Sequence, residues 1–207
     1  MTPMHVPARA RCITLCCLFT TLAPASAFAD WMVTPFIGLK FAGDTTIIQL
    51  EPGAAKESKL TLGGSLAIVS DEIFGIEAEL GYSPRFFERA GTGGLVARSN
   101  VTTLTGNVIA ALPKRITRES LRPYAVAGVG MIHVGIADLK GSLVDTNLLG
   151  IDVGGGAIGP LTRRTSLRFD IRHVRNLRRG QAAPGFGETE ISFWRATVGV
   201  ALLGSLF

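Results

Sequence analysis

The sequence has very little cysteine and histidine. Its three cysteines, Cys12, Cys16 and Cys17, all lie within the first 29 residues. The rest of the chain can therefore form no disulfide, no thiolate metal site and no cysteine nucleophile. Only His133 and His173 follow residue 29, and neither has clustered metal-ligating neighbours in the sequence. We accordingly predict no metal ion and no cofactor.

Long hydrophobic runs are missing as well. After residue 29 no stretch reaches the about 18 apolar residues that indicate a transmembrane helix. The first residues have the order of a cleavable signal peptide: Arg9 and Arg11, a short apolar stretch, and an Ala-x-Ala cleavage pattern at 27–29. An N-terminal membrane anchor is the alternative, but the apolar stretch is too short to span a bilayer. We expect a signal peptide over 1–29 and one domain over 30–207.

Charge is scarce and nearly balanced. Charged residues make up 18% of the chain, and 19 basic residues stand against 16 acidic ones once Arg9 and Arg11 leave with the signal peptide. This small excess predicts no nucleic-acid partner, which an exported chain would rarely meet. Apolar residues, in contrast, make up 47% of the sequence, and there are 25 glycines. An exported, apolar chain without a spanning helix can still occupy a bilayer as a closed β-barrel.

Eight segments have the alternation of apolar with small or polar residues that is typical of β-strands. They are 31–41, 58–70, 73–84, 98–111, 121–137, 147–159, 164–177 and 190–207. Long connections at 42–57, 85–97, 138–146 and 178–189 alternate with short ones at 71–72, 112–120 and 160–163. Long outer loops and short periplasmic turns are typical of outer-membrane barrels. We therefore predict an all-β fold, an eight-stranded antiparallel transmembrane β-barrel.

The alternation gives each strand an apolar face and a small or polar face. In 73–84, for example, Phe74 and Leu80 lie on the opposite face from Glu77 and Glu79. A soluble barrel would show the same pattern with the sides exchanged, but the polar face here has too little charge for a solvated exterior. Its many glycines and alanines suit the narrow interior of an eight-stranded barrel. One segment, 121–137, permits two inward sets: Tyr124 with Gly128 and Gly130, or Ala125 with Ala127 and Met131.

Charges on the predicted lumenal face are balanced. The four basic and four acidic residues are Lys40, Arg168, Arg172, Arg195, Glu77, Glu79, Asp152 and Asp170. Because an unpaired buried charge costs several kcal/mol, a narrow lumen can hold these groups only if they pair or stay hydrated. We expect an ion-pair network in which Arg168, Asp170 and Arg172 face Glu77 and Glu79. Filling and fixing the interior is its favoured role, and ion conduction is the alternative.

Five stretches in order resemble the small outer-membrane β-barrel proteins of the OmpA/OmpX type: WMVTPFIGLKFAGD, IFGIEAELGYSPRFF, LRPYAVAGVGM, GIDVGGGAIG and LRFDIRHVRNL. The resemblance implies a location in the bacterial outer membrane, with outer-membrane lipids and lipopolysaccharide as partners. It also implies that Phe207 is part of the signal read by the barrel-assembly machinery during insertion. Here Leu206, rather than Phe207, continues the apolar face of the last strand.

Three functions fit a barrel of this type. The favoured one is a non-enzymatic barrel that supports the envelope or binds a partner, which the sequence does not identify, through its outer loops. A narrow channel for ions or small apolar ligands is the first alternative. The second is a lipid A-modifying enzyme, because barrel lipid A deacylases carry a histidine, then a serine two residues later, then asparagine. Arg175 stands where that serine should follow His173, so catalysis is disfavoured.

Six arginines lie near the predicted outer ends of the strands: Arg85, Arg89, Arg98, Arg175, Arg178 and Arg179. Guanidinium groups bind phosphate well, and the outer leaflet carries lipopolysaccharide phosphates. We expect some of these arginines to contact lipopolysaccharide, with solvated loop charges as the alternative.

Overall fold

The structure is a computed structural model that describes residues 29–45, 58–86, 96–118, 120–138, 143–177, 180–181 and 188–205. Several calls made from the sequence lie outside these ranges. They are the signal peptide apart from Ala29, the assembly-signal residue Phe207, and Arg89, Arg178 and Arg179. Arg98 lies in a described strand, but its side chain is outside the description.

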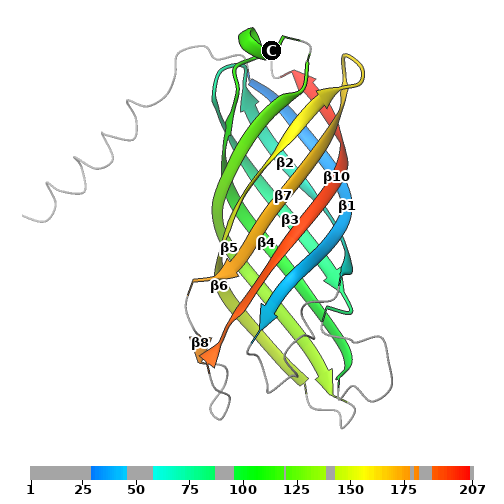
Figure 1. Cartoon of the computed structure of the whole chain (residues 1–207), viewed down its shortest axis with the longest axis vertical. Helices are drawn as coiled ribbons and strands as arrows, with labels where there is room; N and C mark the ends of the chain where they lie inside the picture. Colours follow the sequence, from blue (N-terminus) through cyan, green and yellow to red (C-terminus); the bar gives the residue numbers. More distant parts are fainter. Residues whose placement is uncertain are drawn as a thin grey trace, which may run out of the picture.

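Within the described ranges, eight strands close into an antiparallel barrel (Figure 1). They are β1 Ala29–Thr45, β2 Lys59–Ser70, β3 Phe74–Pro84, β4 Val96–Ala111, β5 Arg122–Asp138, β6 Leu143–Pro160, β7 Thr165–Asn176 and β10 Ile191–Ser205. Each strand pairs with its neighbour along the chain, and β1 closes the barrel against β10. A separate two-stranded ladder joins β8 (Gly180–Gln181) to β9 (Glu188–Thr189). The predicted fold class is confirmed.

Two of the predicted connections differ in the structure. The expected long connection at 138–146 shrinks to 139–142, because β5 and β6 continue pairing as far as Ala137↔Leu143. The polar residues Asp145 and Asn147 belong to this extended hairpin, where cross-strand backbone bonds hold them. At the opposite end, the connection after β4 contains a single helical turn, α2 (Lys114–Thr117).

The outside of the barrel is apolar and the inside holds the polar side chains. On β3, for instance, Phe74, Ile76 and Leu80 are 68%, 61% and 52% exposed, whereas Glu77 and Glu79 are each 4% exposed. A barrel in water would bury the first set and expose the second. This arrangement belongs in a bilayer, and it excludes the soluble barrel that the alternation alone left open. Among the described residues no helix is long and apolar enough to cross a membrane.

Aromatic side chains mark the depth of this apolar surface. On β3, Phe74 and Tyr82 both face outward, eight residues apart. At about 3.3 Å per residue and a strand tilt near 40°, they are separated by roughly 20 Å along the barrel axis. Outward-facing Trp31 and Trp194, at opposite ends of the β1–β10 pair, repeat the pattern. Aromatic residues at the two edges of an apolar band about 25 Å tall are typical of outer-membrane barrels.

The structure also decides the orientation of β5. Tyr124 and Val126 are buried in the lumen, and Met131 is 45% exposed on the outside. The first of the two sets, Tyr124 with Gly128 and Gly130, therefore faces inward. Gly156, opposite Tyr124 on β6, makes room for the ring: a Cβ there would lie 2.7 Å from the tyrosine hydroxyl oxygen.

The interior is built in three layers. Near the long loops lies an apolar cluster: Phe86, Val101, Ile132, Val134, Ile136, Leu148, Val174, Ile191 and Phe193. Near the chain termini lies a second one: Met32, Ala67, Val69, Ile109, Ala111, Tyr124, Val126 and Ala201. We call these the outer and inner apolar layers. The ion-paired residues of the lumen lie between them, and Arg122 is buried at the inner mouth, where it donates to backbone carbonyl oxygens of the turns.

Leu80→Arg should lower the free energy of unfolding by about 2–4 kcal/mol, because it places a charge near the middle of the bilayer. Leu112→Arg is the matched control, since Leu112 is similarly exposed, at 45%, but follows the end of β4. We expect it to cost about 0–1 kcal/mol. Urea unfolding in phospholipid vesicles measures both, and equal effects would contradict membrane burial of this face.

Candidate functional site

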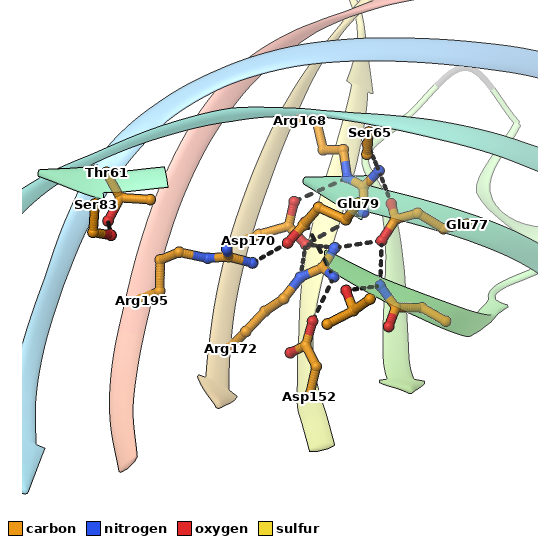
Figure 2. A network of polar contacts seen from close by, with 12 residues as sticks. Thr61, Ser65, Glu77, Glu79, Ser83, Asp152, Arg168, Asp170, Arg172 and Arg195 are labelled. Atoms are coloured by element: carbon orange, nitrogen blue, oxygen red, sulfur yellow. Dashed lines mark hydrogen bonds and ion pairs between the residues drawn. The ribbon is translucent and has the colours of Figure 1, made fainter. Parts of the chain in front are cut away.

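Arg172 is the centre of a buried charge network (Figure 2). Its side chain is fully buried, and among the described residues its guanidinium reaches four carboxylates. Nη2 lies 2.9 Å from Glu77 Oε1 and 3.0 Å from Asp170 Oδ1. Nη1 lies 3.1 Å from Asp152 Oδ2 and 3.2 Å from Glu79 Oε2. One cation thus ties together acidic groups from three strands.

Two further arginines complete the pairing. Arg168 Nη1 lies 2.5 Å from Glu77 Oε2, and its Nε lies 2.9 Å from Asp170 Oδ2. Arg195 donates through Nη2 to Glu79 Oε1. Each carboxylate of Glu77, Glu79 and Asp170 therefore meets two guanidinium groups, which is the condition for holding it without bulk water.

The strand register places these residues. On β7 the two-residue period directs Arg168, Asp170 and Arg172 to the same inward face. Arg195 of β10 lies directly opposite Arg172 in the β7–β10 ladder. Glu77 and Glu79 come from β3, which does not pair with β7, so their contacts with the arginines cross the lumen. The network therefore connects walls of the barrel that no backbone ladder joins directly.

Neutral residues that the sequence did not single out complete the site. Tyr124 donates its hydroxyl hydrogen to Asp170 at 2.5 Å and accepts a hydrogen bond from Arg168 Nε at 2.7 Å. Asn107 donates to Glu77 at 3.0 Å, and Ser65 accepts from Arg168 at 3.3 Å. Each of them is a polar residue at an inward position of its strand. That signal was present in the sequence, but it does not say which polar groups meet.

Lys40 occupies a different position from the arginines. Its side chain is buried, and its Nζ lies 4.2 Å from the centroid of the Phe86 ring. Phe86 in turn packs edge-to-face on Phe193, with ring centroids 5.1 Å apart. A cation over an aromatic face is attracted by the ring quadrupole. Lys40 therefore joins the outer apolar layer to the polar middle of the lumen.

Of the six arginines predicted to meet lipopolysaccharide, two have described side chains. Arg175 is exposed on the outside of β7, opposite Ser192 of β10. Arg85 is exposed just after β3 and adopts a positive φ of 54°. Both lie at the end of the barrel that carries the long loops.

His173 is the candidate catalytic histidine of the deacylase alternative. It is partly exposed beside Trp194, with ring centroids 4.9 Å apart, and Arg175 lies two residues further along the same outward face. Within the described part of the chain His173 makes no hydrogen bond to a serine. The same residues contain no group of three histidine, cysteine or acidic side chains that could hold a metal ion.

Comparison with solved structures agrees with this architecture. Neisserial surface protein A superposes with a TM-score of 0.56 at 12% identity, over 84% of this chain and 97% of that one. The N-terminal β-barrel domain of Pseudomonas aeruginosa OprF gives a TM-score of 0.53 at 16% identity, over 86% and 100%. The chain has the fold of a small outer-membrane β-barrel. OprG, an outer membrane protein of Pseudomonas aeruginosa, gives 0.51 at 15%, over 86% and 96%.

At these identities the likeness extends to the fold alone. No family model matches the sequence, and neither does any curated protein. The function must therefore be argued from the residues of this barrel.

Arg172→Met should lower the free energy of unfolding by about 3–5 kcal/mol, because it leaves buried carboxylates without their shared cation. Arg115→Gln is the control, since Arg115 is an exposed arginine whose Nη2 lies 3.7 Å from Glu72. Removing such a surface pair should change stability by less than about 1 kcal/mol. Urea unfolding in lipid vesicles measures both, and equal losses would mean that the network adds no stability.

Proposed function

We propose that this protein is a non-enzymatic outer-membrane barrel with a closed lumen, which supports the envelope or binds partners through its outer loops. The observation that carries this proposal is the three-layered interior. A pore needs a continuous polar path, whereas this lumen has an apolar layer at each end and paired charges between them.

The charges in the middle layer support closure rather than conduction. Arg172 has its guanidinium nitrogens within 3.2 Å of four carboxylates, so a passing ion would have to separate several buried pairs. It would also have to cross the outer apolar layer, where Phe86 and Phe193 pack together. Hydrophobic constrictions of this kind exclude ions by excluding water. We therefore assign the network the role of fixing the barrel wall.

A lipid A deacylase is the weaker proposal. Its histidine needs a nucleophile to activate, and Arg175 occupies the position where a serine would follow His173. Arginine is always charged and carries no nucleophilic oxygen. The contact between His173 and Trp194 fits a residue at the edge of the bilayer, where aromatic side chains gather.

The exposed arginines at the loop end favour lipopolysaccharide as a surface partner. Arg175 faces outward on β7 opposite Ser192, two residues closer to the loop end than the paired residues His173 and Trp194. A guanidinium placed there can approach the phosphates of the outer leaflet and hold two oxygens at once. Arg85 lies at the same end of the barrel.

The protein reconstituted in planar bilayers should show no sustained conductance. The double variant Glu79→Gln with Arg195→Gln should also stay closed, because the apolar layers at both ends of the lumen remain. A large porin treated in the same way provides the positive control, since barrels of 16–18 strands enclose an aqueous channel. Regular current steps from the wild-type protein, altered by the double variant, would instead support the channel.

Arg175→Gln should weaken lipopolysaccharide binding about two- to fivefold and reduce its dependence on salt, as expected for one solvent-exposed ion pair. Arg115→Gln, a basic residue at the opposite end, is the control and should change neither. Binding is measured on the refolded protein by titration at two salt concentrations.

Lipid A recovered from the mixture should keep all its acyl chains, and loss of a chain would point to catalysis at His173.

A further inference from the structure

A cavity of about 690 Å³ opens at the end of the barrel that carries the termini, opposite the long loops. Its walls come from two of the connections at this end, α2 with its following turn and the β6–β7 turn, and from the adjoining ends of strands that include β1, β2 and β10. In Figure 1 this is the upper end, where the short helix α2 (green) and the end of β10 (red) lie. The volume lies within the range of about 300–1,000 Å³ that is typical of pockets for small ligands.

The floor of this cavity is apolar. Met32 and Val69 belong to the inner apolar layer, and Ile158 and Leu203 pack against it. Trp31, which is 38% exposed, forms part of the side wall. The cavity therefore has a hydrophobic base that continues into the lumen and an aromatic side near the membrane edge.

The rim is basic. Among the lining residues that the structure describes, five are basic and none is acidic: the basic ones are Lys114, Arg118, Arg122, Arg163 and Arg164. Two of the five are already engaged. Lys114 Nζ lies 2.6 Å from Asp71, and Arg122 donates to the backbone carbonyl oxygens of Leu112, Ser70 and Glu72.

The remaining three arginines are exposed and converge from different connections. Arg118 follows α2, and Arg163 and Arg164 lie in the turn between β6 and β7. In the part of the chain that the structure describes, none of the three side chains forms an ion pair. Arg118 also has φ 53° and ψ −124°, a conformation that residues with a side chain rarely adopt.

We propose that this cavity binds an anionic amphiphile. Its phosphate or carboxylate head would lie on Arg118, Arg163 and Arg164, and its acyl body on the apolar floor. Guanidinium groups hold phosphate and carboxylate oxygens through paired hydrogen bonds. A free inorganic anion would use only the rim and leave the apolar floor uncovered. Because short turns face the periplasm in barrels of this type, the inner leaflet of the outer membrane would supply such a lipid.

The built-in reporter for this site is Trp31. The chain has two tryptophans, and the other, Trp194, lies near the opposite end. In a Trp194→Phe background, a lysophospholipid with a brominated acyl chain quenches Trp31 fluorescence when it enters the cavity. Because Trp31 also faces the surrounding detergent, the cavity signal is the saturable quenching that remains once the non-saturable quenching by probe dissolved in the micelle is subtracted. The titration is done on refolded protein in a neutral detergent, with brominated lysophosphatidylglycerol as the anionic probe. Brominated lysophosphatidylcholine is the zwitterionic comparison.

We expect saturable quenching by the anionic probe, about two- to fivefold tighter than by the zwitterionic one, because both carry a phosphodiester but the three arginines repel the choline cation of the second. The triple variant Arg118→Gln, Arg163→Gln, Arg164→Gln should weaken binding of the anionic probe by at least about tenfold, because it removes the charge-assisted hydrogen bonds to the head group. Arg115→Gln, which changes a basic neighbour outside the cavity lining, should alter the affinity by no more than about twofold, because a single exposed charge contributes little. Circular dichroism and heat-modified gel migration show that each variant folds.

Three results would overturn the proposal. An unchanged affinity of the triple variant would mean that the arginines bind no anionic head. Equal affinities for the two lysophospholipids would mean that the site does not select a head with a net negative charge. Complete competition by inorganic phosphate at concentrations similar to those of the lysophospholipid would assign the site to a soluble anion instead. The titration does not depend on whether the lumen conducts, so it stands apart from the function proposed for the outer end.

Discussion

The interaction on which the rest of this barrel depends is that of Arg172 with the carboxylates around it. Burying a carboxylate is expensive unless a cation and hydrogen bonds replace its water. Arg172 supplies that cation to groups on β3, β6 and β7 at once, with Glu77 and Asp152 at 2.9 and 3.1 Å. Because the bilayer outside is apolar, the polar side chains of the strands must point into the lumen. The lumen must therefore provide them with ion pairs and hydrogen bonds.

The apolar layers have a complementary role. They separate the charged middle of the lumen from water at both ends, which strengthens the ion pairs by lowering the local dielectric. The same separation raises the cost of any unpaired charge. The apolar layers and the ion pairs therefore support each other. Gly156 provides the space in which Tyr124 joins the charged layer to the inner apolar one.

The two ends of the barrel carry different chemistry. The loop end has Arg175 and Arg85 exposed on its outer edge, beside the long connections. The end with the termini has short turns that gather Arg118, Arg163 and Arg164 around an apolar cavity. The same alternation along the strands thus leaves two basic surfaces at opposite ends of the barrel.

Much of the fold followed from the sequence. Side chains alternate with a period of two along a strand, so the pattern in 73–84 alone placed Glu77 and Glu79 inside and Leu80 outside. The same pattern could not orient 121–137, where small residues occupy both faces, and it wrongly assigned residues 143–146 to a loop. Pairing with β5 decided that they form a strand.

The sequence by itself determined which charges of seven strands enter the lumen, because each of these strands reports its own two faces. On β5 it did not, and the structure buries Arg122 on the same inward face as Tyr124. Only the tertiary structure decided which charges meet. Closing the barrel brings β3 across the lumen from β7, and so sets Glu77 against Arg172 and places Lys40 beside the Phe86 ring. It also brings the turns after β4 and β6 to one mouth, where they form a cavity. Strand order, stagger and closure create these contacts, and no single strand contains that information.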